Sequence, residues 1–300
     1  GDSFTRKMED PKLSTSSHRT PSNEPEIIND PRFRAGRVIV QEGKEIEGAI
    51  SIFASLLEAT RTKYGETSLD AAIAYYEYGN ALFRASAAAE VTRNEGASVP
   101  PPKPDTDVDL ALEMMETAFS ILDQNYEDGK NNSWMEDQRP RFLVGIGDVL
   151  SFQNKHADAA DAYIRAIPLR EAAVASANDK NTLDYLKKRR LVTETFVLVS
   201  EELLACPKGE DVVASTTLLV TGTECVEYIK GYYEKAKDEL QEAVFLMGRI
   251  AAAGIDLQSE KEDICFLATM LMGVGNALAD IDEEERKKVA AHISKKSKLL

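Results

Sequence analysis

The sequence predicts an all-α protein, a solenoid of helical hairpins, and three observations support this fold class. Its 300 residues include only 17 glycines and 11 prolines, fewer than average, so turns are sparse. Hydrophobic residues reach 43% while aromatic residues make up 7%, and alanine is abundant, a mixture that suits helices better than sheets. Apolar residues recur three and four positions apart along most of the chain, and no segment has a persuasive strand pattern.

Residues 1–31 are expected to form a flexible leader. The stretch LSTSSHRTPSNEP is rich in Ser, Thr, Pro and Asn and has almost no periodic apolar positions. The helical pattern begins near residue 32. It predicts helices at 33–42, 45–62, 69–87, 108–124, 139–153, 156–178, 183–206, 210–222, 224–253 and 258–281.

Two connections stand out between the early helices. Gly65 can adopt the left-handed conformation that closes one helix, and Thr67 with Asp70 has the spacing of a capping box that opens the next. This joint is expected to be a tight turn. Residues 88–107 contain three successive prolines, Pro100–Pro102, which exclude a helix and predict an extended surface loop.

An internal repeat organises these helices. The tetratricopeptide pattern places a small residue where two helices touch, Ala twelve residues later, a large residue four after that and Ala three further on. One segment fits without adjustment, through Leu143, Ile146, Gly147, Leu150, Ala159, Tyr163 and Ala166. Only small side chains let the two helices of a unit approach, and Tyr163 is expected to fill the space between units.

Three further units fit the pattern with insertions. The first has Gly36 followed by Ala49, Phe53 and Leu56. The second has Tyr75, Tyr78, Gly79 and Leu82 in one helix and Ala111, Met115 and Ala118 in the other, with the proline loop between them. The fourth is the weakest, with Phe196, Val199, Ser200 and Leu203, then Ala214 and Leu218.

Residues 32–253 are therefore expected to form a solenoid with the insertion loop 88–107 and a terminal cap. The cap is a long amphipathic helix over 224–253. Its apolar stripe consists of Ile229, Tyr233, Ala236, Leu240, Val244, Met247 and Ile250. A solenoid needs a cap because its last repeat otherwise exposes an apolar face, and the alternative use of the stripe is a homodimer. Residues 254–282 predict an additional C-terminal helix, and 283–300 a basic tail.

Composition narrows the function. With 36 basic and 51 acidic residues the formal net charge is −15, which argues against direct nucleic-acid binding, since phosphates need clustered Lys and Arg. A basic protein partner is more natural. Three cysteines without CxxC spacing and three scattered histidines provide no disulfide scaffold, zinc site or catalytic triad. We expect no enzyme activity, no cofactor and no metal.

The sequence also predicts the cellular location of the protein. By this reading no apolar run approaches the roughly 18 residues of a spanning helix, so no membrane partner is expected. The odd number of thiols fits a reduced, intracellular protein. The basic clusters Arg286–Lys288 and Lys295–Lys298 are candidates for a nuclear-import signal.

In addition to the interrupted second unit, five short segments of the sequence indicate a family resemblance. They are KYGET at 63–67, YEYGNAL at 76–82, DVDLALEMM at 107–115, GIGDV at 145–149 and LVTETFVL at 191–198. Together, over roughly residues 33–250, they resemble the NASP family of histone chaperones, whose tetratricopeptide array is interrupted within its second unit. The chain departs from that family in one respect, because its interruption lacks the usual long acidic tract.

The resemblance implies a protein that binds core histones, chiefly the three–four pair, and in some members linker histone. The role is storage, transport and nucleosome assembly, in the nucleus with a cytoplasmic pool. It implies no catalysis and no cofactor. The ETFVLVSE stretch at 194–201 matches the part of the family that holds a histone peptide.

The concave face supplies the candidate binding residues. In such solenoids the first helix of each pair lines this face, at positions three before the small residue and one and four after it. The candidates for histone binding are Glu194, Val197, Glu201, Asp148, Val144, Tyr76 and Asn80. Carboxylates there would meet Arg or Lys of a basic segment, and Val197 or Tyr76 would accept an apolar anchor.

Two alternatives stay open. The acidic residues can be ordinary solvated helix charges. The chain can also be a generic tetratricopeptide adaptor that binds a peptide segment of another protein, such as the acidic tail of a molecular chaperone. That role needs Lys, Arg and Asn along the groove, where only Asn80 and Arg84 fit.

Overall fold

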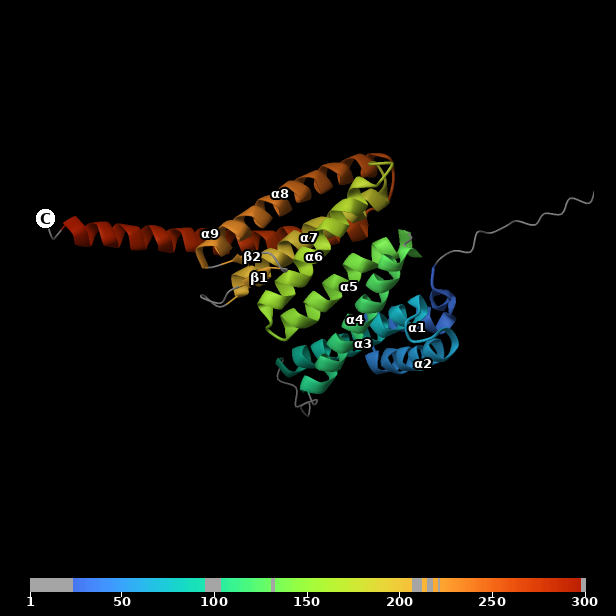
Figure 1. Cartoon of the computed structure of the whole chain (residues 1–300). Coiled ribbons are helices and arrows are strands. Elements are labelled where there is room, and N and C mark those ends of the chain that lie inside the picture. The colour runs from blue at the N-terminus through green and yellow to red at the C-terminus, as the bar shows by residue number, and fades with distance from the viewer. Residues whose placement is uncertain are drawn as a thin grey trace, which may run out of the picture.

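The computed structural model describes residues 24–94, 104–130, 133–206, 212–214, 218–220 and 222–297. These residues are almost entirely helical, as expected for an all-α protein (Figure 1). Most of the leader, residues 1–23, lies outside the described residues. The short helix η1 and the start of α1 follow at once.

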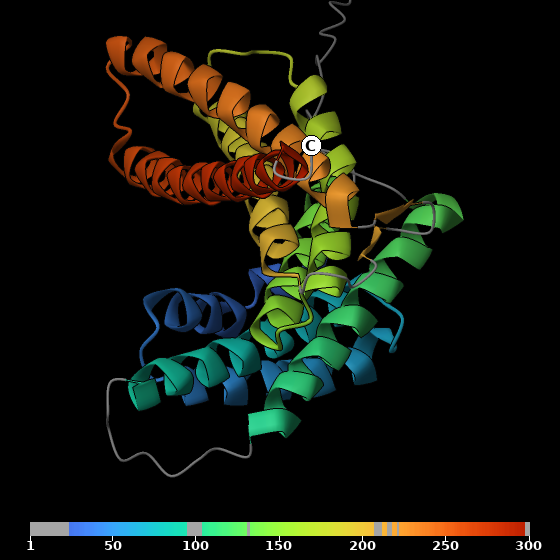
Figure 2. The ribbon, with the colours of Figure 1, turned by 90° about the vertical axis from the view of Figure 1, so that its left-hand side faces the viewer.

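The helices have the following bounds: η1 Glu26–Asn29, α1 Pro31–Glu42, α2 Ile46–Tyr64, α3 Leu69–Asn94, α4 Pro104–Asn125, η2 Tyr126–Lys130, α5 Ser133–Phe152, α6 His156–Ala175, α7 Leu183–Ala205, α8 Gly222–Ala252 and α9 Gln258–Ser297. Each long helix from α1 to α8 packs on the next along the chain, so the molecule is a stack of antiparallel helical hairpins. The pair α1 and α2 lies at one end of this stack and α8 with α9 at the other (Figures 1 and 2).

Small residues hold the hairpins together where the repeat pattern expects them. A Cβ on Gly147 would lie 2.4 Å from Cε1 of Tyr163, closer than real contacts allow, so α5 and α6 touch at this glycine. Gly36 meets the ring of Phe53 in the same way, and Gly79 meets the backbone of Ala111. These three contacts confirm the first three tetratricopeptide-type units.

The second unit is interrupted between its two helices, but the interruption is shorter than expected. Helix α3 continues to Asn94 and α4 begins at Pro104, so helix replaces loop at both ends of the expected 88–107 segment. Proline is compatible with the first turn of a helix, because its missing N–H has no partner there in any case. The segment 95–103 lies outside the described residues.

The turn before α3 uses different residues from the expected capping box. Gly65 ends α2 as expected and has a positive φ of 91°, but its ψ of 158° differs from that of the expected left-handed helical conformation. The hydroxyl of Ser68, not Thr67, accepts the N–H of Ala71 at 3.1 Å. Asp70 instead accepts the N–H of Ile27 at 2.8 Å and so ties η1 to α3. Burial raises the pKa of this carboxyl.

The expected helix over 210–222 was wrong. Residues Val212–Ala214 (β1) and Leu218–Val220 (β2) form a two-stranded antiparallel hairpin, in which Val212 pairs with Val220. This segment is rich in Val and Thr, whose branched side chains favour strands. Ala214 and Leu218 therefore do not complete the fourth unit, and α8 packs on α7 in place of the expected helix.

Helix α8 is the expected long amphipathic helix, and α7 and α9 both pack on it. Its stripe residues Ile229, Ala236 and Ile250 are buried, which leaves them unavailable to a second copy. Tyr233, Leu240 and Met247 are partly buried, and Val244 is 47% exposed. The buried part of the stripe packs within the protein, and a homodimer stays a prediction.

Helix α9 differs from expectation in two ways. It extends to Ser297, so helix replaces most of the expected 283–300 tail. It also contains a run over 264–281 with one charged residue, and Gln258–Glu283 is long and apolar enough, by length and composition alone, to span a membrane. The expectation that no such run exists was wrong. Many of its apolar residues serve packing: Ile264, Leu267, Leu271, Val274 and Leu278 are buried.

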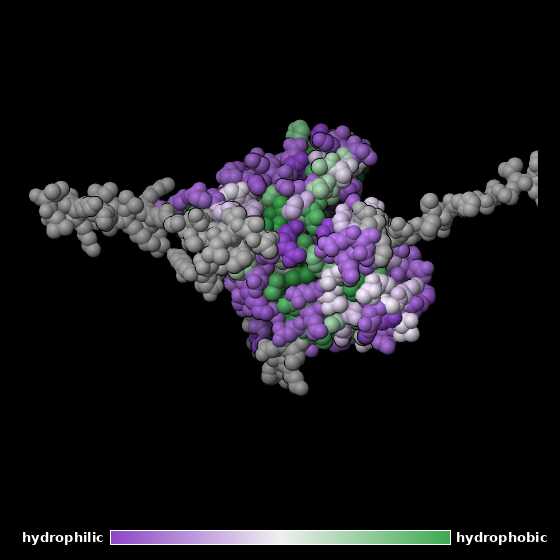
Figure 3. Space-filling model, in the orientation of Figure 1, coloured by the Kyte–Doolittle hydropathy of each residue, from purple (hydrophilic) through white to green (hydrophobic). Residues whose placement is uncertain are grey.

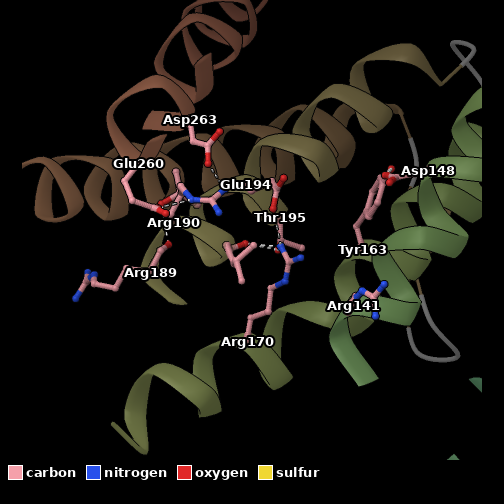
Figure 4. Close-up of polar contacts among 12 residues, drawn as sticks. Arg141, Asp148, Tyr163, Arg170, Arg189, Arg190, Glu194, Thr195, Glu260 and Asp263 are labelled. Atoms are coloured by element: carbon pink, nitrogen blue, oxygen red, sulfur yellow. Dashed lines mark hydrogen bonds and ion pairs between the residues drawn. The ribbon is translucent and has the colours of Figure 1, made fainter. Parts of the chain in front are cut away.

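Ion pairs join α7 to the terminal helices. Arg189 contacts Glu239 of α8 at 2.7 Å. Arg190 contacts Glu260 of α9 at 3.1 Å and Asp263 at 3.5 Å (Figure 4). The basic residues in the first turns of α7 thus connect α8 and α9 to the repeat units. Because Glu260 is buried, this attachment is protected from solvent.

Candidate functional site

The first helices of the four units, α1, α3, α5 and α7, carry the candidate site. Contacts between α1 and α3 and between α3 and α5 show that these helices lie side by side. Figure 3 shows one face of the molecule, where polar residues surround a band of apolar ones. The charged residues of these helices fall into two groups of opposite sign, which we describe in turn.

The negative group, the acidic row, consists of Asp148 on α5 and Glu194, Glu201 and Glu202 on α7. The hydroxyl of Tyr163 donates a hydrogen bond to Oδ1 of Asp148 at 2.8 Å (Figure 4). Burial raises the pKa of Asp148 to about 6, although this hydrogen bond opposes the shift. The neighbouring charge of Glu194 adds to it, so Asp148 and Glu194 share one field.

Glu194 is not a simple solvated charge, because Arg170 of α6 lies beside it. The Nη1 atom of Arg170 is 3.3 Å from Oε2 of Glu194, 2.6 Å from Oγ1 of Thr195 and 2.5 Å from the carbonyl oxygen of Leu191 (Figure 4). Arg170 is 8% exposed, and burial lowers its pKa. Part of the charge of Glu194 is therefore already neutralised inside the protein.

Glu201 is the acidic-row residue that remains open to a partner. It is half-buried and makes no hydrogen bond or ion pair with another described residue. Burial and the charge of Glu202 raise its pKa. A carboxylate in this setting gains from a cation, since pairing offsets the loss of hydration.

Glu202 makes internal contacts instead. Its carboxylate accepts a hydrogen bond from Oγ of Ser151 at 2.6 Å and lies 2.8 Å from Nδ1 of His156. Ser151 contacts the carboxylate and not the imidazole, so these three residues do not have the order of a nucleophile and its base. Among the described residues no group of three His, Cys, Asp or Glu side chains could hold a metal ion.

The expected apolar contacts need correction. Val197 is fully buried and Tyr76 is 5% exposed, so neither side chain can accept an apolar anchor from a partner. Val197 belongs to the core between helices. Tyr76 stacks on Phe142 with 4.1 Å between ring centroids, and burial raises its pKa to about 12. Val144 is half-buried and remains the available apolar candidate.

Asn80 belongs to the second group, a cationic pocket between α1, α3 and α5. This hollow of about 620 Å³ is lined by Arg34, Arg37, Val38, Val40, Gln41, Glu77, Asn80, Arg84 and Arg141. The expectation of an acidic and apolar groove is therefore wrong for the part between α1 and α3, which is cationic, while binding along the acidic row of α5 and α7 stays a prediction. Arg84 lies at the boundary, where its charge lowers the pKa of Asp148 against the effect of burial.

Sequence reasoning missed Arg170 and most of the pocket arginines. Arg34 and Arg37 are three residues apart on α1, a spacing that places both on one helix face, and this signal was available. Arg141 and Arg170 carry no such signal. Their positions follow from how α5 and α6 pack on distant helices.

The comparisons with known proteins bear on the fold alone. No family profile and no curated protein matches the chain. Similar solved structures include a putative kinesin light chain from Podosopora anserina with nearly identical TPR-like repeats, and a single-residue variant of it. Both are 12% identical, with a TM-score of 0.38. The alignments cover 76% and 77% of this chain and 95% and 94% of those chains.

Proposed function

We propose that the protein is a histone chaperone that binds a basic segment of the core histones, chiefly of the three–four pair, along its acidic row. Support comes from the resemblance of five segments to the NASP family and from the interrupted second unit, which the helices α3 and α4 retain. The proposal includes a nuclear location with a cytoplasmic pool and no catalysis. The missing acidic tract makes linker histone a secondary partner.

The open carboxylate of Glu201 carries this proposal. Glu194 has Arg170, Asp148 has Tyr163, and Glu202 has Ser151 and His156, whereas Glu201 makes no such contact among the described residues. A Lys or Arg of the guest would complete its pairing, and the other carboxylates would strengthen the local negative field. The half-buried Val144 offers an apolar contact on α5.

The mechanism is equilibrium binding. The net charge of −15 favours rapid encounter with a strongly basic guest, and binding is expected to weaken as salt rises. Bound histone segments would be shielded from premature contact with DNA. Specificity would come from the few groove contacts, because long-range charge does not distinguish one basic protein from another.

Glu201→Lys tests the proposal. The three–four histone pair and the other core pair are titrated against the protein, with Glu113→Lys as the control, because Glu113 is exposed on α4 outside the groove. We expect Glu201→Lys to weaken three–four binding at least tenfold, about 1.4 kcal/mol, and Glu113→Lys to have little effect. Equal losses in both variants would contradict the proposal, as would unchanged affinity.

One observation favours a second function. An adaptor for an acidic peptide needs cations in the groove, and the pocket between α1, α3 and α5 has four arginines. The two functions use different parts of the concave face. They can therefore be separated by variants of Glu201 on one side and of Arg84 on the other.

A further inference from the structure

We propose that the basic end of α9 from one copy of the protein binds the acidic row of a second copy, in the place that a histone segment would take. The basic end consists of residues 286–297, the last turns of α9. The inference rests on the proposed function of the acidic row. It names a competitor for that row within the protein's own sequence.

The basic end concentrates positive charge in an acidic protein. It contains no acidic residue and five basic ones, namely Arg286, Lys287, Lys288, Lys295 and Lys296. The net charge of the whole chain is −15, so the rest of the chain carries −20. Two copies therefore repel each other over most of their surfaces, and contact is favoured where this segment of one copy meets carboxylates of the other.

The sequence of the basic end has the pattern of an amphipathic helix. Val289 and Ile293 are four residues apart, so they share one face of the helix. Lys288 and Lys295 are seven residues apart and share a different face. A basic face beside an apolar one is the chemistry that the proposed guest brings to the acidic row, where carboxylates and Val144 are available.

Helix α9 carries this segment away from the repeats of its own copy. Asp282 pairs with Lys230 of α8 at 3.1 Å, whereas Lys287 pairs with Glu283 at 2.7 Å, within α9 itself. Figure 1 shows α9 continuing past the other helices. The helix is continuous to Ser297, so a return to the acidic row of the same copy would break it. A second copy is therefore the partner that the basic end can reach as a helix.

The acidic row has a carboxylate open to this segment. Glu201 is half-buried and makes no hydrogen bond or ion pair with another described residue. The carboxylate of Glu202 beside it is occupied, by Oγ of Ser151 at 2.6 Å and Nδ1 of His156 at 2.8 Å. A lysine of the basic end would pair with Glu201 through a charge-assisted hydrogen bond.

Such self-association would regulate access to the acidic row. Pairs between partly exposed charges are weak and are screened by salt, so the contact is expected to be reversible. A histone brings more positive charge than the basic end and would displace it. Protein without a guest would then keep its acidic row covered by a second copy.

Sedimentation velocity of the full chain, over a range of protein and salt concentrations, tests the inference. The basic-end variant is Lys288→Glu with Lys295→Glu, and the row variant is Glu201→Lys. The control for the basic-end variant is Lys180→Glu with Lys261→Glu, which makes the same change of charge at two exposed lysines outside both surfaces.

The control for the row variant is Glu113→Lys, since Glu113 is exposed on α4. Circular dichroism establishes that all variants keep their helices. We expect the parent and both controls to associate at low salt and to dissociate at high salt. The basic-end variant and the row variant, each alone, are expected to associate at least tenfold more weakly.

An equimolar mixture of these two variants should associate more tightly than either alone, because the unchanged row of one can meet the unchanged basic end of the other. A parent that stays monomeric at low salt would overturn the inference. So would association that both variants retain, or a mixture that gains nothing, which is the result expected if each basic end occupies the row of its own copy.

Titration of the three–four histone pair against the same variants separates this inference from the proposed function. Removing the competitor should make the basic-end variant bind histones several-fold more tightly than its control does. Self-association with the expected variant pattern but no histone binding would support the inference and contradict the proposed function. Histone binding by a parent that never self-associates would contradict the inference alone.

Discussion

The hydroxyl of Tyr163 on α6 lies 2.8 Å from Oδ1 of Asp148 on α5, while the ring of the same tyrosine packs against Gly147. One side chain thus performs both the repeat packing and the placement of a groove carboxylate. The position of Asp148 is coupled to the distance between α5 and α6. Changes that increase the distance between α5 and α6 are therefore expected to displace the carboxylate of Asp148.

Tyr163→Phe tests this coupling. The variant keeps the ring but removes the donor that opposes the shift, so the pKa of Asp148 is expected to rise above its value of about 6. The free energy of unfolding should fall by about 1 kcal/mol for the lost hydrogen bond. Carboxyl chemical shifts followed by NMR against pH measure the first effect, with Tyr228→Phe as an exposed control. An unchanged pKa would show that the hydroxyl does not act on Asp148.

Asp148→Asn tests the pH dependence of stability. The folded pKa of about 6 lies above the ordinary 3.8, so between pH 4 and 6 the folded state holds a proton that the unfolded state has lost. The contribution of Asp148 to the stability of the parent therefore falls as pH rises through this window. Asparagine carries no charge, so the variant should gain stability relative to the parent between pH 4 and pH 7. Urea denaturation at both pH values measures this, and a pH-independent difference would contradict it.

Replacing Gly147 by alanine tests the contact between α5 and α6. Replacing Gly231 is the control, because it should change the free energy of unfolding in the opposite direction. Gly147→Ala places a Cβ 2.4 Å from Tyr163, and we expect a loss of about 1–3 kcal/mol in the free energy of unfolding. Gly231→Ala, in α8, meets no atom within 4 Å and should stabilise the protein by about 0.5–1 kcal/mol. Thermal denaturation compares them. Similar effects at the two sites would mean that α5 and α6 do not touch there.

Glu77→Gln tests the pocket from within. Removing the carboxylate leaves Arg141 and Arg37 without their acid, and because both arginines are partly exposed we expect a loss of about 1–2 kcal/mol. The pocket then carries one more net positive charge, so an acidic peptide, the ligand of the second function, should bind several-fold more tightly when its affinity for the variant is compared with that for the parent. Denaturation and anisotropy measure the two effects. Weaker peptide binding in folded Glu77→Gln would argue against charge as the basis of recognition.

The repeat pattern anticipated the fold because close packing demands particular residues at particular places. Gly147 and Tyr163 could be found from their spacing alone, and so could the displaced Ala111. The hairpin of β1 and β2 could not, since three-residue strands are too short for periodicity to separate from helix. The hydrogen bond from the N–H of Ile27 to the carboxylate of Asp70 could not be predicted, because the two residues are far apart in sequence.

The candidate site was harder to predict than the fold. Position in the repeat places Val197 on the groove side of α7, but it says nothing about the neighbouring helices that bury this valine completely. The sign of the charge in the part of the groove between α1 and α3 was predicted wrongly for a related reason. Net charge averages over the chain, whereas Arg34, Arg37 and Arg141 come from two helices far apart in sequence and meet only in three dimensions.

The break between Asn94 and Pro104 has a consequence for engineering. Helices α3 and α4 pack along each other, so their pairing is expected to depend only weakly on how many residues join them. Each doubling of a flexible linker costs only about 0.6 kcal/mol in closure entropy. A reporter domain or an entirely new recognition module could therefore be spliced in at this point, with the host scaffold still able to assemble.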